Sequence, residues 1–110
     1  MKIYIASPYT KGDQAENVRR QLEVADKLMS MGHTPFLPLL SHFQHLCFPR
    51  PYEDWMRVDL EWLYCCDALL RLDGESEGAD REVEEAEAAS MDIYYSLEQI
   101  PCDKVHRAED

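Results

Sequence analysis

The chain has 110 residues, of which 45% are hydrophobic and 30% charged, and these values fit one globular domain and exclude a mostly disordered chain. The net charge of −11 means that the surface repels a phosphate backbone, so RNA and DNA polymers are unfavourable partners. A single nucleotide held in a local pocket is still compatible with this charge, because a few backbone N–H groups and one or two cations can overcome the overall field.

The four cysteines have neither a C-x-x-C pair nor a metal-ligand spacing, so we expect them to be buried as small hydrophobic residues. Met1 and Lys2 lead directly into a short apolar strand, so we expect no signal peptide. A membrane-spanning helix needs about 18 consecutive apolar residues, and no apolar run in the sequence approaches this length. We therefore expect a soluble, cytoplasmic protein that does not contact a membrane.

Apolar patterns of strand and helix period alternate along the chain. The first long helix is expected to begin after Asp13, an N-cap, with Glu16 completing a capping box. Its apolar stripe includes Leu22 and Met29. In chain order, the patterns predict a strand over 2–6, a helix over 13–31, a strand over 34–37, a long loop over 39–51, a helix over 52–66, a strand over 68–72, a helix over 80–91 and a strand over 93–95.

This order predicts an α/β protein with a small, doubly wound, Rossmann- or flavodoxin-like parallel sheet and helices on both of its faces. The domain is expected to span residues 1–100, and the polar residues 101–110 are expected to form a loose C-terminal tail. Ligands of such sheets bind near the carboxyl ends of the strands. The loops over 7–12, 39–51 and 73–80 are therefore expected to form the binding site.

Two carboxylates lie on helix faces that are otherwise apolar. In the helix over 52–66, Asp59 falls in the apolar arc with Trp55 and Leu63. In the next helix, Glu82 is the one acid inside the apolar arc, in the expected first turn and directly after the loop that Gly74 and Gly78 bracket. A carboxylate in such surroundings is costly unless it is paired, hydrogen-bonded or protonated.

Each acid has a structural explanation as well as a chemical one. Glu82 could stabilise the helix dipole, and Asp59 could hydrogen-bond a neighbouring loop. Two inward acids near one sheet edge together favour chemistry. Paired carboxylates suit cleavage at an acetal-like carbon, because one can attack or stabilise the carbon while the other moves protons on the leaving group. Tyr4, on the first strand, could hydrogen-bond one of them or simply be a core aromatic.

The chain contains, in this order, the segments K-I-Y-I-A-S-P-Y, D-L-E-W-L-Y-C-C-D-A-L-L and S-E-G-A-D-R-E-V-E-E-A. With these segments, about residues 1–96 of the chain resemble the nucleoside 2-deoxyribosyltransferase-like superfamily, which includes the 2′-deoxynucleoside 5′-monophosphate N-glycosidases. The resemblance implies that Glu82 is the nucleophile that attacks C1′ and that Asp59 contacts the sugar and helps to protonate the leaving base. It also implies that Tyr4 orients the nucleophile and that no metal or organic cofactor is needed.

The resemblance further implies a set of substrate-binding residues. Ser7 and Ser76 match positions that bind the 5′-phosphate, and Gly78 matches a turn glycine. His42 belongs to the 39–51 loop, where the base should be recognised. Family members are dimers or larger, so we expect a homo-oligomer in which a neighbouring copy completes the pocket, with Ser96 as the candidate residue.

Two features depart from the family pattern. Asp80 stands where the family has a small residue, and its charge would weaken phosphate binding or serve another hydrogen bond. The 39–51 loop has no secure match, so the identity of the base, and whether His42 and His45 bind it or only pack, stay open.

We therefore expect an N-glycosidase that hydrolyses a nucleoside or deoxynucleoside 5′-monophosphate, since Ser7 and Ser76 fit the monophosphate hydrolases. A deoxyribosyltransferase would result if a second base excluded water from the glycosyl intermediate. A non-catalytic nucleotide-binding or regulatory module would keep the serines but would have no need for Glu82 inside the apolar arc.

Overall fold

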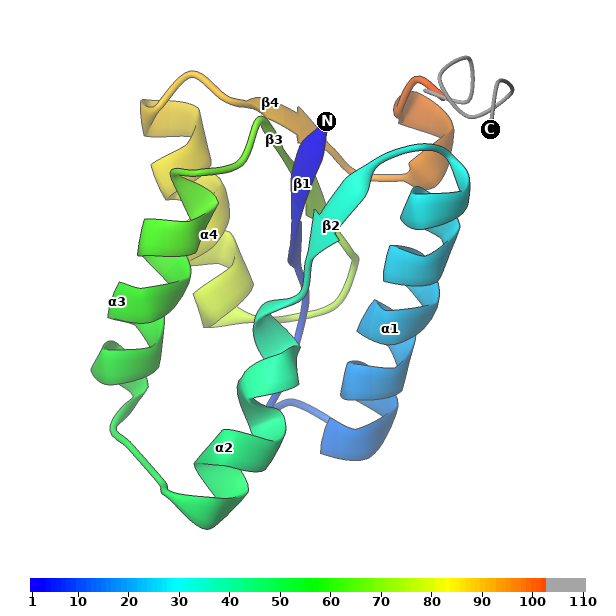
Figure 1. The fold of residues 1–110 in the computed structure, drawn as a ribbon. Helices are drawn as coiled ribbons and strands as arrows, with labels where there is room; N and C mark the ends of the chain where they lie inside the picture. The colour runs from blue at the N-terminus through cyan, green and yellow to red at the C-terminus, as the bar shows by residue number, and fades with distance from the viewer. Residues whose placement is uncertain (103–110) are drawn as a thin grey trace.

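Four parallel strands form the centre of the structure, a computed structural model that describes residues 1–102 (Figure 1). The strands are β1 (Lys2–Ala6), β2 (Thr34–Phe36), β3 (Ala68–Arg71) and β4 (Asp92–Tyr94), in the spatial order β2-β1-β3-β4. The helices are α1 (Gln14–Ser30), α2 (His42–Cys47), α3 (Tyr52–Leu63) and α4 (Glu77–Ala88), with short 3₁₀ helices η1 (Pro38–Ser41) and η2 (Leu97–Gln99). This confirms the predicted α/β fold with a parallel sheet.

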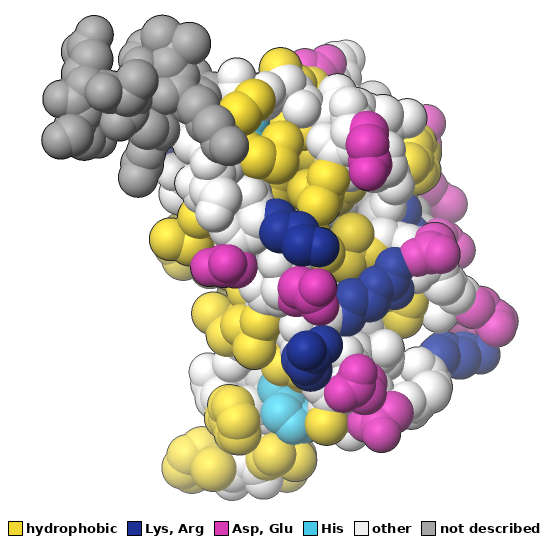
Figure 2. All heavy atoms as spheres, turned by 90° about the vertical axis from the view of Figure 1, so that its right-hand side faces the viewer, with side chains coloured by type: hydrophobic (Ala, Val, Ile, Leu, Met, Phe, Trp, Pro, Cys, Tyr) yellow, Lys and Arg dark blue, Asp and Glu magenta, His cyan; other side chains and the backbone are white. Residues whose placement is uncertain are grey.

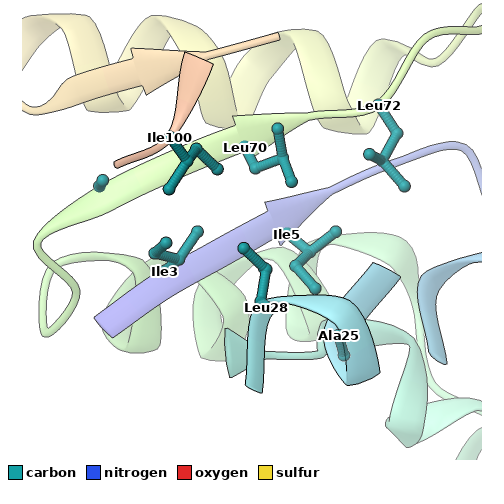
Figure 3. Close-up of a cluster of buried hydrophobic side chains, with 8 residues drawn as sticks. Ile3, Ile5, Ala25, Leu28, Leu70, Leu72 and Ile100 are labelled. Carbon is teal, nitrogen blue, oxygen red and sulfur yellow. The ribbon is translucent and has the colours of Figure 1, made fainter. Parts of the chain in front are cut away.

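The alternation of side chains along β1 divides the core into two layers. Ile3 and Ile5 point to one face, where Leu28 of α1 packs against them (Figure 3). Tyr4 and Ala6 point to the other face, in the cluster that α3 and α4 complete. Because strand side chains alternate with a period of two, this register turns Tyr4 toward α4.

The sheet has a topological switch point between β1 and β3. From β1 the chain passes through α1 to β2 at one edge, and α3 then returns it across β1 to β3. Figure 1 shows α1 on one side of the sheet and α3 and α4 on the other. Open parallel sheets bind ligands in the crevice at such a reversal, outside the carboxyl ends of the strands.

The buried face of α1 differs from the predicted stripe. Gln21, Ala25 and Leu28 are the buried residues, whereas Leu22 is 45% and Met29 58% exposed. The prediction followed apolar residues only and so missed a polar side chain whose hydrogen bonds are satisfied inside the protein. The predicted N-cap is confirmed, because the Asp13 side chain accepts a hydrogen bond from the Glu16 backbone N–H.

Two predicted boundaries around the site are wrong. Helix α4 begins at Glu77 rather than near residue 80, because the hydroxyl of Ser76 caps it by accepting the Ala79 N–H at 3.0 Å. Gly78 is therefore a helical residue rather than part of a turn, and Glu82 lies in the second turn of α4 rather than the first. The 39–51 segment is not an irregular loop, since it contains the end of η1 and all of α2.

Cys47, Cys65 and Cys102 are exposed, so the expected burial of the cysteines is wrong for these three. Of the predicted C-terminal tail, the Pro101 carbonyl accepts a hydrogen bond from His33 Nε2 at 2.6 Å, and residues 103–110 lie outside the described part of the chain. Within residues 1–102, the helices are too short or too polar to cross a membrane.

Helix α2 is the least embedded of the four α-helices. It has no buried residue, and Phe43 and Leu46 on it, with Phe48 after it, are 70%, 62% and 70% exposed. Figure 2 shows charged side chains of both signs interspersed over the face of α1, whereas apolar side chains gather at the lower end, where Figure 1 places α2. This helix lies at the carboxyl end of the sheet, next to the switch point.

We predict that Leu28→Ala lowers the free energy of unfolding by about 2–5 kcal/mol, because it leaves a cavity between α1 and the sheet. Leu22→Ala on the same helix should cost about 1 kcal/mol or less, since Leu22 is 45% exposed. Urea unfolding of both variants measures the difference. Equal losses would contradict the observed orientation of α1.

Candidate active site

A pocket of about 490 Å³ opens at the carboxyl ends of the central strands. Its volume is in the range of small-molecule sites. The walls come from the residues that follow β1, from the segment between β2 and α3, from α3 itself and from the start of α4. These include all three predicted loops. Six of the predicted site residues line it: Ser7, His42, Asp59, Ser76, Gly78 and Glu82.

Glu82 is the most deeply buried acid of the pocket, at 6% exposure. The hydroxyl of Tyr4 donates a hydrogen bond to its Oε2. Burial raises the pKa of the Glu82 carboxyl from 4.5 to about 8; the Tyr4 hydrogen bond lowers it, the charge of Asp59 raises it and the charge of Arg71 lowers it. The site therefore holds a carboxyl group that exchanges its proton near neutral pH.

Tyr4 lies behind Glu82 rather than in the pocket wall. Its side chain is fully buried, and its ring stacks on Phe36 at a centroid distance of 5.5 Å. Burial, together with the charges of Glu82 and Asp59, raises the pKa of the Tyr4 phenol well above 10. Tyr4 thus stays neutral and donates its hydroxyl hydrogen to Glu82, as expected of a residue that orients this carboxyl group.

Asp59 reaches the same pocket from α3. It is partly buried, and burial raises the pKa of its carboxyl from 3.8 to about 7. The pKa values of the two carboxyl groups, about 7 and about 8, thus lie close together, and the charge of Asp59 affects Glu82. One of them can be ionised while the other keeps its proton.

Arg71, whose side chain is only 10% exposed, links β3 to the start of α4. It donates to the Gly74 carbonyl at 2.8 Å and to Asp80 Oδ1 at 2.9 Å. Asp80 therefore serves a hydrogen-bonded ion pair, which is one of the two roles that the sequence left open for this acid. The same cation lowers the pKa of Glu82.

Gly78 leaves space where α3 and α4 approach each other. A Cβ atom there would lie 3.5 Å from Tyr52 Oη and 3.7 Å from Met56 Cε, which is ordinary contact. Larger side chains would extend into the pocket that Tyr52 and Met56 also line. The glycine thus keeps the pocket open from a helical position.

The two histidines of the 42–47 helix are held by aromatic partners. His42 Nδ1 lies 2.5 Å from Tyr9 Oη, and His45 Nδ1 accepts the indole N–H of Trp55 at 2.8 Å. Because an indole N–H can only donate, the neutral His45 carries its proton on Nε2. All four side chains line the pocket, so this end of it is aromatic.

Sequence reasoning missed the cations of the pocket. Lys11 and Arg50 both line it, and each is paired with an acid, Lys11 with Glu75 at 3.4 Å and Arg50 with Asp54 at 3.2 Å. Both cations lie in loops that were expected to bind ligand. A search of those loops for basic residues would have found them.

Ser96, like Tyr4, is not among the residues that line the pocket. It precedes η2, and its carbonyl accepts the Gln99 N–H at 3.2 Å. Its expected contribution to the pocket of a neighbouring copy stays a prediction.

A family model described as a domain of unknown function (DUF7768) matches residues 1–96. Curated proteins give no match. Among solved structures, the chain is similar to a 2-deoxyribosyltransferase from the psychrotolerant bacterium Bacillus psychrosaccharolyticus, with a TM-score of 0.52 and 22% sequence identity. The similarity covers 81% of this chain and 64% of that one, so this chain spans less than two thirds of that enzyme. It confirms the nucleoside 2-deoxyribosyltransferase-like fold.

We predict that Glu82→Gln becomes progressively more stable than the parent as the pH rises. The folded-state pKa of Glu82, about 8, lies above its ordinary 4.5. The stability of the protonated form is therefore fully present below pH 4.5 and is lost as the pH rises through about 8, and glutamine has no such loss. Melting temperatures of both proteins between pH 4 and 9 measure this difference, and curves that stay parallel would contradict the burial argument.

Proposed function

The chain belongs to the DUF7768 family, and we propose that it is an enzyme that cleaves the N-glycosidic bond of a nucleoside 5′-monophosphate. The observation that carries the proposal is the pair of carboxyl groups, Glu82 and Asp59, in one pocket, with Tyr4 hydrogen-bonded to the more buried one. A purely structural Glu82 would not require an opening to a pocket of this volume. A retaining glycosidase requires such a pair.

In the first step, the ionised Glu82 attacks C1′ of the sugar, from the less populated protonation state of the pair, in which Asp59 keeps the proton. A C1′–O bond forms, the C1′–N bond breaks, and its electron pair goes to the leaving base. Asp59 gives its proton to the base, so that a neutral base departs. The product is a glycosyl ester of Glu82.

In the second step, water attacks C1′ of this ester. Asp59, now ionised, takes a proton from the water, and the C1′–O bond to Glu82 breaks. The sugar 5-phosphate leaves, and both carboxyl groups return to their starting protonation. If a second base replaces the water, the same intermediate gives base transfer, the reaction that the name of the similar 2-deoxyribosyltransferase describes.

The start of α4 supplies the phosphate end of the proposed site. Ser76, Gly78 and Ala79 line the pocket there, next to Ser7 of the loop after β1. A helix N-terminus favours an anion, because its N–H groups and its dipole point toward it. The hydroxyls of Ser7 and Ser76 add two donors, which supports a monophosphate rather than an unphosphorylated nucleoside.

The aromatic end of the pocket is where we place the base. Trp55 of α3 and Tyr9 of the loop after β1 can enclose a planar ring between apolar faces. His42 and His45 lie beside them and offer polar ring atoms. The exposed side chains of Phe43 and Leu46 lie on the same helix and would suit contact with a second copy of the chain.

We predict that the protein releases free base from at least one nucleoside or deoxynucleoside 5′-monophosphate. Glu82→Gln should lower this activity by at least about 1000-fold, because it removes the nucleophile. Chromatography of a panel of nucleosides and their 5′-monophosphates, with and without a second free base, measures release and transfer.

Glu84→Gln is the matched control, since Glu84 is an exposed acid on the same helix and should leave the rate unchanged. Release that requires the second base would assign transfer instead of hydrolysis. A parent that binds nucleotides tightly but never turns them over would overturn the enzyme assignment in favour of a nucleotide-binding module.

The pH dependence of kcat/KM should be bell-shaped, with limbs near pH 7 and pH 8 that belong to the pair of Asp59 and Glu82. Tyr4→Phe removes a hydrogen bond that lowers the pKa of Glu82, so the Glu82 pKa should rise. The alkaline limb should then move to higher pH and the maximum should fall by about tenfold. A lower rate with unmoved limbs would show that Tyr4 acts by packing alone.

A further inference from the structure

Gln21 is a buried polar residue on α1 that takes no part in the proposed chemistry. It is 1% exposed and makes three hydrogen bonds. Its Nε2 donates to the Ile5 carbonyl at 3.1 Å and to Ser7 Oγ at 2.8 Å, and its Oε1 accepts the Leu39 N–H at 3.0 Å. One side chain thus joins the residues that follow β1 to those that follow β2.

The orientation of the amide is fixed by two backbone partners. A carbonyl oxygen can only accept and a backbone N–H can only donate. Turning the amide over would place Oε1 against the Ile5 carbonyl and Nε2 against the Leu39 N–H, and both contacts would be repulsive. Nε2 must therefore face Ser7.

This orientation decides what the Ser7 hydroxyl can do. Its oxygen already accepts an N–H from Gln21, so its own hydrogen is left to be donated elsewhere. Ser7 lines the pocket, and within residues 1–102 its side chain makes no other hydrogen bond. The hydroxyl hydrogen of Ser76 is likewise available to donate, since the Ser76 oxygen already accepts the Ala79 N–H. Both serines are thus set as donors toward an anion.

The third hydrogen bond of Gln21 acts on the opposite wall. Leu39 and its neighbour Pro38 line the pocket, and the Leu39 N–H is held by Gln21 Oε1. Leaving this partly buried Leu39 N–H unpaired would be costly, so the hydrogen bond ties the segment after β2 to the side chain that also bonds Ser7. The gap between the two walls is therefore set from inside α1.

We infer that Gln21 is a positioning residue, which presents Ser7 as a hydrogen-bond donor to the 5′-phosphate of the substrate. The inference rests on the proposed function for the identity of the anion. Gln21 would thus help the protein to distinguish a nucleotide from its nucleoside, although Gln21 does not line the pocket.

The test measures binding in the Glu82→Gln background, so that the ligand is not consumed. Calorimetry gives the dissociation constants of the four 2′-deoxynucleoside 5′-monophosphates and of the matching deoxynucleosides, and their ratio is the phosphate preference. Gln21→Met and Ser7→Ala should each lower this preference by about tenfold, the effect of a hydrogen bond to a charged group. Their combination should lower it no further than Ser7→Ala alone, because Gln21 acts through Ser7.

Gln14→Met, an exposed position at the start of the same helix, is the matched control and should keep the preference. If thermal melting shows that Gln21→Met does not fold, Gln21→Glu replaces it. In its protonated form, this side chain can still bond Ile5 and Leu39 but has no second hydrogen for Ser7.

A preference that Gln21→Met leaves intact, or that falls further when it is added to Ser7→Ala, would overturn the inference. So would a parent that binds nucleotide and nucleoside equally. If the preference behaves as expected but no base is ever released, the proposed reaction fails and the role of Gln21 stands. If base is released and the preference does not depend on Gln21, the proposed reaction stands and the role of Gln21 fails.

Discussion

The contact between Tyr4 and Glu82 joins the centre of the sheet to the pocket, and much of the site depends on it. A carboxyl group at 6% exposure is unfavourable when ionised, and the hydrogen bond from a buried phenol is one of the two interactions that lower its pKa. Tyr4 can make this bond because the alternation along β1 turns it to the face of α4, while Ile3 and Ile5 fill the face of α1. The same alternation thus builds the core and places the polar partner of Glu82.

The sequence could predict the parallel α/β sheet and the inward position of the acids because both follow from regular patterns. Strands and helices alternate in the chain, and Glu82 interrupts an apolar arc of period 3.6. The structure confirms the fold and places Glu82, Asp59 and Ser7 in one pocket. Their catalytic and binding roles stay predictions, since position alone does not establish chemistry.

What the sequence could not predict depends on contacts between distant residues. The burial of Gln21 requires the Ile5 carbonyl and the Leu39 N–H, which a helical pattern on α1 does not contain. The apolar pattern therefore selected Leu22, which is 45% exposed. Likewise, helix α4 begins earlier than predicted because the hydroxyl of Ser76 caps it. The prediction from sequence places a turn there on the basis of Gly74 and Gly78.

The net charge of −11 limits how this pocket can attract an anion. Its cations Lys11 and Arg50 are each within 3.4 Å of an acid, so a neighbouring carboxylate offsets each positive charge. Under the proposed function, selection of the phosphate depends on neutral donors at short range, namely the start of α4 and the hydroxyls of Ser7 and Ser76. Such donors act only when their hydrogens point at the ligand. In an acidic protein, a buried amide that fixes the direction of one hydroxyl can therefore matter more for phosphate recognition than an additional exposed lysine.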